Sequence, residues 1–112
     1  MNRHKYELFN LMDPVAGLAD FDDIVDQYFE LGELDEPKYR SIIEREFVPY
    51  YRKINKDDLV TLKNDLETAL NDDDYDFERD FECVLPPFDP PENPRDFFVW
   101  IDEAIQKILA QE

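Results

Sequence analysis

Cysteine, histidine, serine and glycine are scarce in this 112-residue chain, which contains one cysteine, one histidine, one serine and two glycines. A serine or cysteine nucleophile would have to recruit His4, and no nucleophile motif surrounds Ser41 or Cys83. Two glycines are too few for a phosphate-cradling loop, and one cysteine with one histidine is too few for a zinc site. We therefore expect no enzymatic activity and no cofactor.

Disulfides and membrane-spanning segments are also not expected. The single cysteine, Cys83, excludes an intramolecular disulfide framework. No apolar run approaches the roughly 18 residues that suggest a transmembrane helix, and the N-terminal residues lack the basic and apolar regions of a secretion signal. We expect a cytoplasmic protein without a membrane partner.

Positive charge is the third scarcity. Twelve lysines and arginines stand against 29 aspartates and glutamates, which gives 12 − 29 = −17 at pH 7. A net charge of this size repels itself and destabilises the folded state, so solubility alone does not explain it. It would also repel the phosphates of nucleic acids and the surface of anionic membranes. The expected partner is therefore a basic protein and not a nucleic acid.

Apolar side chains recur at helical spacing, and no segment sustains the alternation of a β-strand. Helices are expected over residues 3–12, 20–31, 35–47, 55–70 and 93–109. Asp35, Asn55 and Asn93 are the expected N-caps, and Pro49 is expected to stop or kink the third helix near Phe47. The predicted fold is all-α, a single domain of 112 residues built as a small bundle of four to five helices.

The helical periodicity also predicts which side chains face the core. In the helix over residues 20–31, the apolar arc consists of Phe21, Ile24, Val25, Tyr28 and Phe29. In the helix over residues 55–70, the buried stripe consists of Leu59, Leu62, Leu66, Ala69 and Leu70. Lys63 is expected on the solvent side of that helix.

The other face of the helix over residues 20–31 is acidic. Its carboxylates form what we call the acidic stripe: Asp22, Asp23, Asp26 and Glu30. Like charges four residues apart destabilise a helix by a few tenths of a kcal/mol per pair, so helix formation does not require this pattern. The acidic stripe is our second candidate for a partner contact, and the alternative is an ordinary solvated face.

The densest negative charge lies in residues 72–82, the acidic segment, which reads DDDYDFERDFE. Its aromatic side chains distinguish it from a solvated acidic tail. As our first candidate for a partner contact, its carboxylates would steer a basic protein, while Tyr75 and Phe77 would anchor it. The steering carboxylates are Asp72, Asp74, Asp76, Glu78 and Asp80. The alternative is a solvated connection whose Phe77 and Phe81 only pack into the core.

The alternating carboxylates of the acidic segment also resemble a calcium-binding loop that starts at Asp72. An EF-hand requires glycine at the sixth position and a bidentate glutamate at the twelfth. Phe77 and Cys83 occupy those positions. No dedicated metal site is expected, and a carboxylate-rich metal-binding protein is the lesser alternative.

Four features of the sequence between residues 18 and 108 carry a resemblance to a known family. They are the pair Tyr28-Phe29 in an acidic helix, the leucines Leu59, Leu62 and Leu66, the connection with Pro87, Asp89 and Pro90, and the closing run Arg95-Asp96-Phe97-Phe98-Val99-Trp100-Ile101. In these features the chain resembles the small helical immunity proteins of bacterial contact-dependent growth inhibition systems.

The resemblance implies a cytoplasmic protein that binds and neutralises one cognate toxin domain delivered by a neighbouring cell. Combined with the charge of −17, it favours a basic toxin domain, such as a nuclease, bound by one monomeric chain in a 1:1 complex. The sequence does not identify the toxin or its substrate. The alternative function is an acidic adaptor or chaperone that binds a secreted protein.

Overall fold

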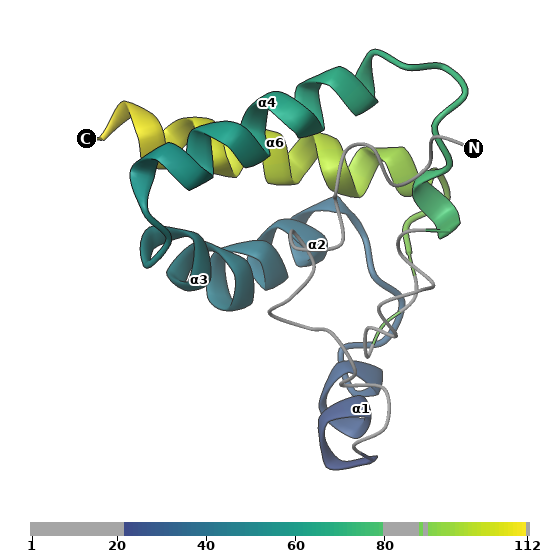
Figure 1. The fold of residues 1–112 in the computed structure, drawn as a ribbon. Helices are drawn as coiled ribbons and strands as arrows, with labels where there is room; N and C mark the ends of the chain where they lie inside the picture. Colours follow the sequence, from purple (N-terminus) through teal and green to yellow (C-terminus); the bar gives the residue numbers. More distant parts are fainter. Residues whose placement is uncertain (1–21, 80–87, 89, 112) are drawn as a thin grey trace.

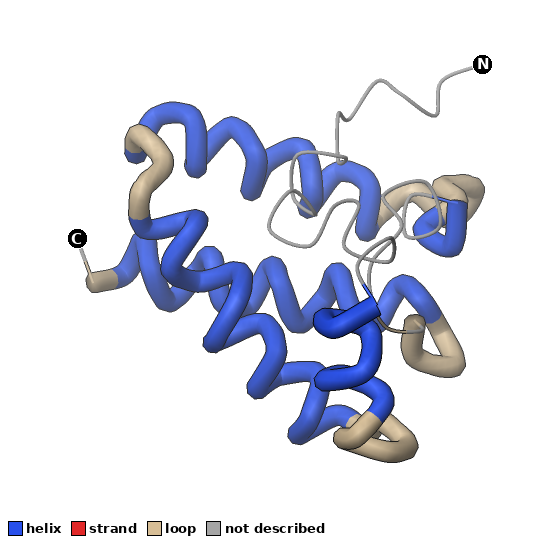
Figure 2. Tube along the Cα trace, turned by 90° about the horizontal axis from the view of Figure 1, so that it is seen from below, coloured by secondary structure: helices blue, strands red, loops and turns tan. Residues whose placement is uncertain are grey.

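The computed structural model describes residues 22–79, 88 and 90–111. Its elements are α1 (Asp22–Phe29), α2 (Glu36–Ile42), the π-helix η3 (Ile43–Phe47), α3 (Val48–Arg52), α4 (Lys56–Leu70) and α6 (Pro94–Ala110). Residues 77–79 add a short helical turn. Within these ranges the chain is helix and connecting loop without a strand (Figure 1, Figure 2), which confirms the all-α prediction. The expected helix over residues 3–12 lies outside the described residues.

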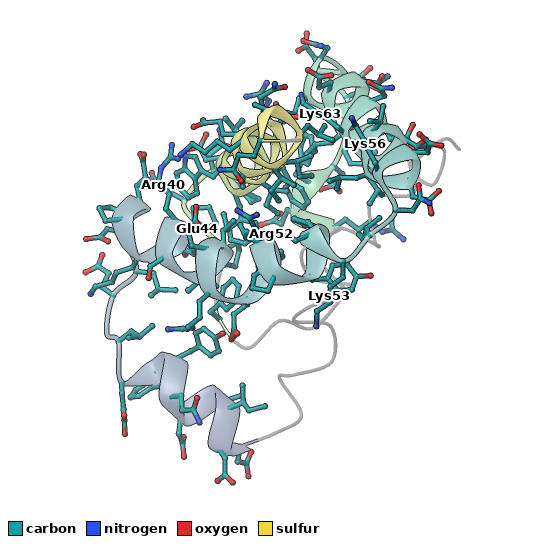
Figure 3. All side chains as sticks on the ribbon, turned by 90° about the vertical axis from the view of Figure 1, so that its left-hand side faces the viewer. Arg40, Glu44, Arg52, Lys53, Lys56 and Lys63 are labelled. Atoms are coloured by element: carbon teal, nitrogen blue, oxygen red, sulfur yellow. The ribbon has the colours of Figure 1, made fainter. Side chains whose placement is uncertain are left out.

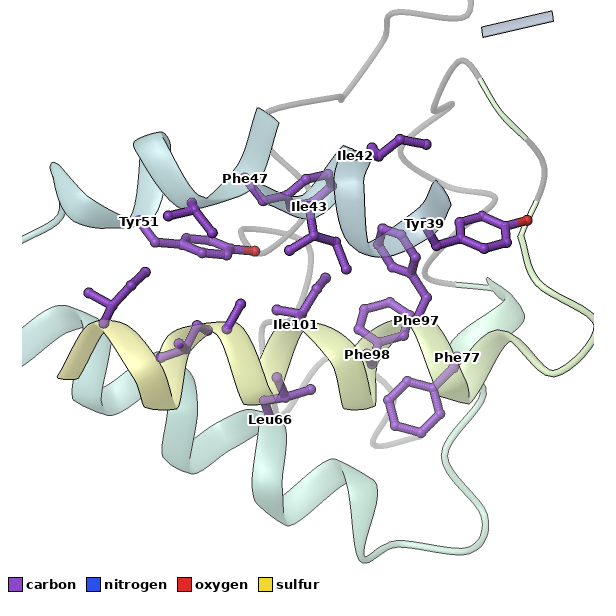
Figure 4. Packing of buried hydrophobic residues seen from close by; sticks show 14 of the residues in the cluster. Tyr39, Ile42, Ile43, Phe47, Tyr51, Leu66, Phe77, Phe97, Phe98 and Ile101 are labelled. Carbon is purple, nitrogen blue, oxygen red and sulfur yellow. The ribbon is translucent and has the colours of Figure 1, made fainter. Parts of the chain in front are cut away.

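Helix α6 is the central element of the bundle. It runs beside α4, and the continuous helical segment formed by α2, η3 and α3 packs on another side of it (Figure 1, Figure 4). Helix α1 lies apart from this body, and a turn around Gly32 connects it to α2 (Figure 1). The buried apolar side chains of the described residues form one cluster.

The centre of that cluster is aromatic. Phe47, Tyr51, Phe97 and Phe98 have no exposed surface. The ring of Phe97 packs edge-on against the ring of Phe47, with 5.6 Å between the centroids, and so joins α6 to η3 (Figure 4). Such aromatic pairs contribute about 0.5–1.5 kcal/mol beyond the area that they bury.

Side-chain caps begin three of the helices, as the sequence predicts. The Asp35 carboxylate accepts a hydrogen bond from the Lys38 backbone N–H at 3.1 Å. The side-chain oxygens of Asn55 and Asn93 accept from backbone N–H groups two residues further on, at 2.8 and 3.2 Å. Each cap satisfies a backbone donor that the first helical turn leaves without a partner.

Pro49 does not stop the helix near Phe47. The chain changes to π-helical hydrogen bonding over η3, where the Val48 N–H donates to the Ile43 carbonyl five residues back. Pro49 then lies in the first turn of α3, where its missing N–H costs little. The wider π turn lets the proline ring follow the helix without the clash that an α-helix would impose, so the helical segment continues to Arg52.

Lys63 is not on the solvent side of α4. It is 8% exposed, and its ammonium group lies 3.0 Å from a Glu67 oxygen and 3.3 Å from an Asp102 oxygen on α6. Burial lowers the pKa of Lys63, but its bonds to Glu67 and Asp102 raise that pKa by more. The aliphatic stem is covered because α6 packs beside it. Lys63 stands four residues after Leu59 and three before Leu66, so helical spacing places it at the edge of the buried face.

Candidate functional site

The described part of the acidic segment, residues 72–79, is an ordered loop that follows the end of α4. An Asp72 carboxylate oxygen accepts from the Asp74 N–H at 3.0 Å, and the Asp72 carbonyl accepts from the Tyr75 N–H at 3.1 Å. The Asp76 carboxylate accepts from the Arg79 N–H at 3.0 Å and so caps the short helical turn of residues 77–79. Local hydrogen bonds thus fix the path of a backbone that carries closely spaced negative charges.

The two aromatic side chains of this loop have different environments. Phe77 is 5% exposed and packs on Phe98 with 4.9 Å between ring centroids. It therefore belongs to the core and is not available as a partner anchor, which corrects our expectation for this residue. Tyr75 is half-buried and packs on Phe77 at 4.9 Å. Asp80 and Phe81 lie outside the described residues.

The loop borders an open pocket of about 270 Å³ between the end of α4 and the start of α6. Its lining residues are Leu70, Asp72, Asp73, Tyr75, Asp76, Phe77, Glu78, Asn93, Pro94 and Arg95. Arg95 donates to the Leu70 carbonyl at 2.8 Å and so joins the two helix ends. Four carboxylates against one guanidinium make the pocket acidic, which suits a lysine or arginine side chain of another protein.

The sequence predicts the carboxylates on one side of the pocket. It does not predict the residues on the other side. Arg95 and Leu70 are separated by 25 positions in the chain, and no local pattern relates them. The expected steering residues Asp72, Asp76 and Glu78 do line the pocket, whereas Asp74 does not. Only the packing of α6 against α4 shows that these groups share one depression.

The acidic stripe occupies a different part of the molecule, on α1 (Figure 1). All its members, Asp22, Asp23, Asp26 and Glu30, are exposed. The predicted apolar arc of this helix is only partly correct, because Tyr28 is buried, Ile24 and Val25 are half-buried, and Phe29 is 83% exposed. Phe21 lies outside the described residues. Successive residues turn by about 100° around a helix, so the side that packs against the core holds Tyr28 and Ile24 and leaves Phe29 toward solvent.

The buried ring of Tyr28 attaches α1 to the rest of the protein. Its hydroxyl donates to a Glu46 carboxylate oxygen at 2.8 Å, and its ring lies 5.3 Å from the ring of Phe88. The guanidinium of Arg45 lies 5.7 Å from the Tyr28 ring centroid, a distance at which a cation is attracted to the aromatic face. Burial and then the Glu46 hydrogen bond raise the pKa of the Tyr28 phenol.

Basic side chains gather at the opposite end of α4 from the acidic segment. Arg52, Lys53 and Lys56 come from the end of α3 and the turn into α4 (Figure 3). Arg52 donates to the Gln111 side chain at 3.0 Å, beyond the end of α6. The 15 residues of α4 span roughly 22 Å. These three bases share that end of α4 with Asp57 and Asp58. Because the length of α4 exceeds the Debye length of about 8 Å at physiological salt, the three bases do not neutralise the acidic segment.

Two further observations concern metals and membranes. Across residues 22–79, 88 and 90–111, no three histidine, cysteine, aspartate or glutamate side chains are grouped so that they could hold a metal ion. In the same ranges, no helix combines the length and the apolar character needed to cross a membrane.

No family model matches the chain, and neither a curated protein nor a solved structure matches it.

Proposed function

We propose that this chain is an immunity protein that binds and neutralises a basic toxin domain delivered by neighbouring bacteria, as in contact-dependent growth inhibition. The observation that carries the proposal is the ordered acidic loop at one end of a helical bundle, with the basic side chains at the other end of α4. A carboxylate array held on a stable frame fits a cationic cleft, where it would replace the phosphates of a nucleic-acid substrate.

Two properties of the loop favour recognition over simple solvation. Its backbone is fixed by the hydrogen bonds of Asp72 and Asp76 and by the burial of Phe77, so little conformational entropy is lost on binding. Its pocket offers carboxylates on a concave surface to a protruding lysine or arginine of the toxin. We therefore assign the steering role to the acidic segment, with Tyr75 as the partly exposed aromatic contact.

The test pairs this chain with the C-terminal domain encoded in the neighbouring reading frame. That domain should arrest growth when expressed alone, and co-expression of this chain should restore growth. The purified chain should also inhibit the enzymatic activity of the purified domain at a 1:1 ratio. Binding without inhibition would instead favour an adaptor, and growth arrest that this chain does not relieve would contradict the proposal.

A charge-reversal pair locates the contact. Asp74→Lys with Glu78→Lys changes the net charge from −17 to −17 + 4 = −13, and both side chains are exposed. At low salt we expect association with the domain to slow roughly tenfold or more. The matched control, Glu44→Lys with Asp58→Lys, makes the same change of net charge at exposed positions on η3 and α4. Equal association rates for the two double variants would show that the acidic segment is not the contact.

A further inference from the structure

We propose that the end of α1 provides the apolar anchor of the interface, with Phe29 inserting into an apolar cleft that basic residues of the partner surround. This inference rests on the proposed function and deepens it. We call the surface the α1 tip, and it comprises Phe29 and Leu31 together with the acidic stripe. The acidic segment would steer the partner, and the α1 tip would hold it.

The first observation is exposure. Phe29 is 83% exposed and Leu31 is 37% exposed. Among the described residues they are two of the three exposed large apolar side chains, and the third is Val60 on α4. An isolated exposed apolar residue is ordinary in a soluble protein. Here two of them end one short helix, Asp26 lies one turn before Phe29, Glu30 follows it, and Asp22 and Asp23 lie in the first turn of the same helix. Exposed apolar side chains with charged neighbours match the composition of a protein interface.

The second observation is that the backbone beneath these side chains is held in place. Tyr28 precedes Phe29 and is fixed by its hydrogen bond to Glu46 and its packing on Phe88. The ammonium group of Lys38 donates to the Leu31 carbonyl at 2.8 Å and to the Glu33 carbonyl at 3.0 Å. Gly32 makes the turn at a φ of 73°, a conformation that glycine adopts without a steric penalty.

This anchoring matters for affinity. A large side chain that is already displayed on an ordered backbone loses little conformational entropy when a partner covers it. Aromatic side chains with this placement are frequent among the few residues that dominate the energy of an interface. Phe29 is the described aromatic residue that best meets this requirement, because Phe77 is buried and Tyr75 is half-buried.

Charge identifies the kind of partner. Asp22, Asp23 and Asp26 lie on the same helix as Phe29 and Glu30 directly follows it, so whatever covers Phe29 must approach a negative surface. A second copy of this chain would bring another −17 and would be repelled, as would an anionic lipid surface. A protein surface with lysines or arginines around an apolar cleft would bury the Phe29 ring and pair with the carboxylates.

The decisive comparison uses the domain encoded in the neighbouring reading frame as the probe. Wild-type binding must be measured first, because its absence would contradict the proposed function and this inference together. If the wild type binds, Phe29→Ala should raise Kd roughly thirtyfold, mainly through faster dissociation. Val60→Ala removes an exposed apolar side chain from α4 and should change Kd less than about twofold. A Kd for Phe29→Ala that matches the Val60→Ala control would overturn the α1 tip while leaving the proposed function intact.

A photochemical experiment tests the same contact directly. The chain with Phe29→p-benzoylphenylalanine should cross-link to the domain on irradiation, and the chain with Val60→p-benzoylphenylalanine should not. The cross-linked peptide of the domain should contain lysine or arginine close to apolar residues. Cross-linking from position 29 only to a second copy of this chain, or no cross-link within a complex that does form, would overturn the inference.

Discussion

Helices α4 and α1 each combine an apolar stripe with a polar face, but the structure uses them differently. Helix α4 lies beside α6, and its Leu59, Leu66 and Ala69 are 1% exposed or less. In α1 only Tyr28 is buried, and Phe29 stands in solvent. Isolated helices shorter than about 12–15 residues are marginal in water, so the eight residues of α1 depend on the contacts of Tyr28 for their position.

This difference assigns fold stability to the buried residues of α4 and partner binding to the exposed residues of α1. The interface between α4 and α6 supplies buried area that holds the fold together, and a substitution there should act on folding. The exposed side chains of α1 contribute little to folding, so substitutions there should act on binding while the chain stays folded. Three stability measurements test this division, and they complement the binding experiments described above.

The largest loss of stability should follow Leu66→Ala. Leu66 has no exposed surface, so the substitution removes buried methyl groups and leaves a cavity next to α6. We expect a loss of about 3 kcal/mol in the free energy of unfolding, measured by urea denaturation. Leu62→Ala, at a half-buried position of the same helix, should cost clearly less. A loss below about 1 kcal/mol for Leu66→Ala would contradict the description of the α4–α6 interface as the centre of stability.

A smaller effect should follow Lys63→Met, which leaves the Asp102 carboxylate without its cation. The Asp102 side chain is 22% exposed, so water replaces part of the interaction that it loses. We expect the free energy of unfolding to fall by about 1–2 kcal/mol. The pKa of Asp102 is raised by burial more than Lys63 lowers it. The folded state therefore takes up a proton there more readily than the unfolded state, and the deficit should shrink as pH falls through the folded-state pKa.

A double variant controls for the removal of lysine itself. Replacing both, with Lys63→Met and Asp102→Leu, removes the more buried carboxylate together with its cation and leaves only the Glu67 carboxylate, which is 49% exposed and hydrated, without Lys63. The double variant should recover most of the lost stability, since paired apolar replacements of ion pairs are often neutral. A double variant less stable than Lys63→Met alone would indicate that Asp102 stabilises the fold through other contacts.

The smallest of the three effects should follow Tyr28→Phe, which removes the hydrogen bond to Glu46 and should cost about 1 kcal/mol near neutral pH. The pKa of Tyr28 is raised above 10.0, first by burial and then by Glu46. Its stabilising contribution is therefore complete below pH 10 and is lost as pH rises through the folded-state pKa. Urea denaturation at pH 8 and pH 11 should show the gap between wild type and variant narrowing.

The neighbouring residue supplies the control for Tyr28. Phe29→Ala should change the free energy of unfolding by less than about 0.5 kcal/mol at either pH, because its ring is exposed. If Phe29→Ala destabilised the chain as much as Tyr28→Phe, then Phe29 would be part of the fold and the α1 tip would not be a free surface.

Local sequence patterns predicted the helices with good accuracy. Asp35, Asn55 and Asn93 were identified as caps, because a cap depends on the residue and its next three neighbours. The apolar side chains that face the core of α4, such as Leu59, Leu66 and Ala69, follow from the 3.6-residue period. The chemistry of the acidic segment was also visible in the sequence, because charge density requires no knowledge of contacts.

The errors occurred where a distant element decides the outcome. The charge of Lys63 suggests the wet side of α4, but the residue lies four positions after Leu59 and three before Leu66, on the face that α6 covers. Its ammonium group donates to Asp102, 39 positions away in the chain. The sequence does not distinguish Phe77 from Tyr75 as a candidate partner anchor. In the structure the ring of Phe98 packs on Phe77. At Pro49 the expected stop does not occur, and the reason is local to the chain, because the π-helical turn of η3 lets the helix continue.

By itself, the sequence determined the helical class of the described residues, the start of three helices and the net charge of −17. These properties depend on composition and on residues within one or two turns of each other. Only the tertiary structure decided that Tyr28 faces inward while Phe29 faces solvent, and that Arg95 and Leu70 close one side of an acidic pocket. Whether a side chain is buried depends on which helices pack against each other. That packing depends on many residues that are far apart in the chain.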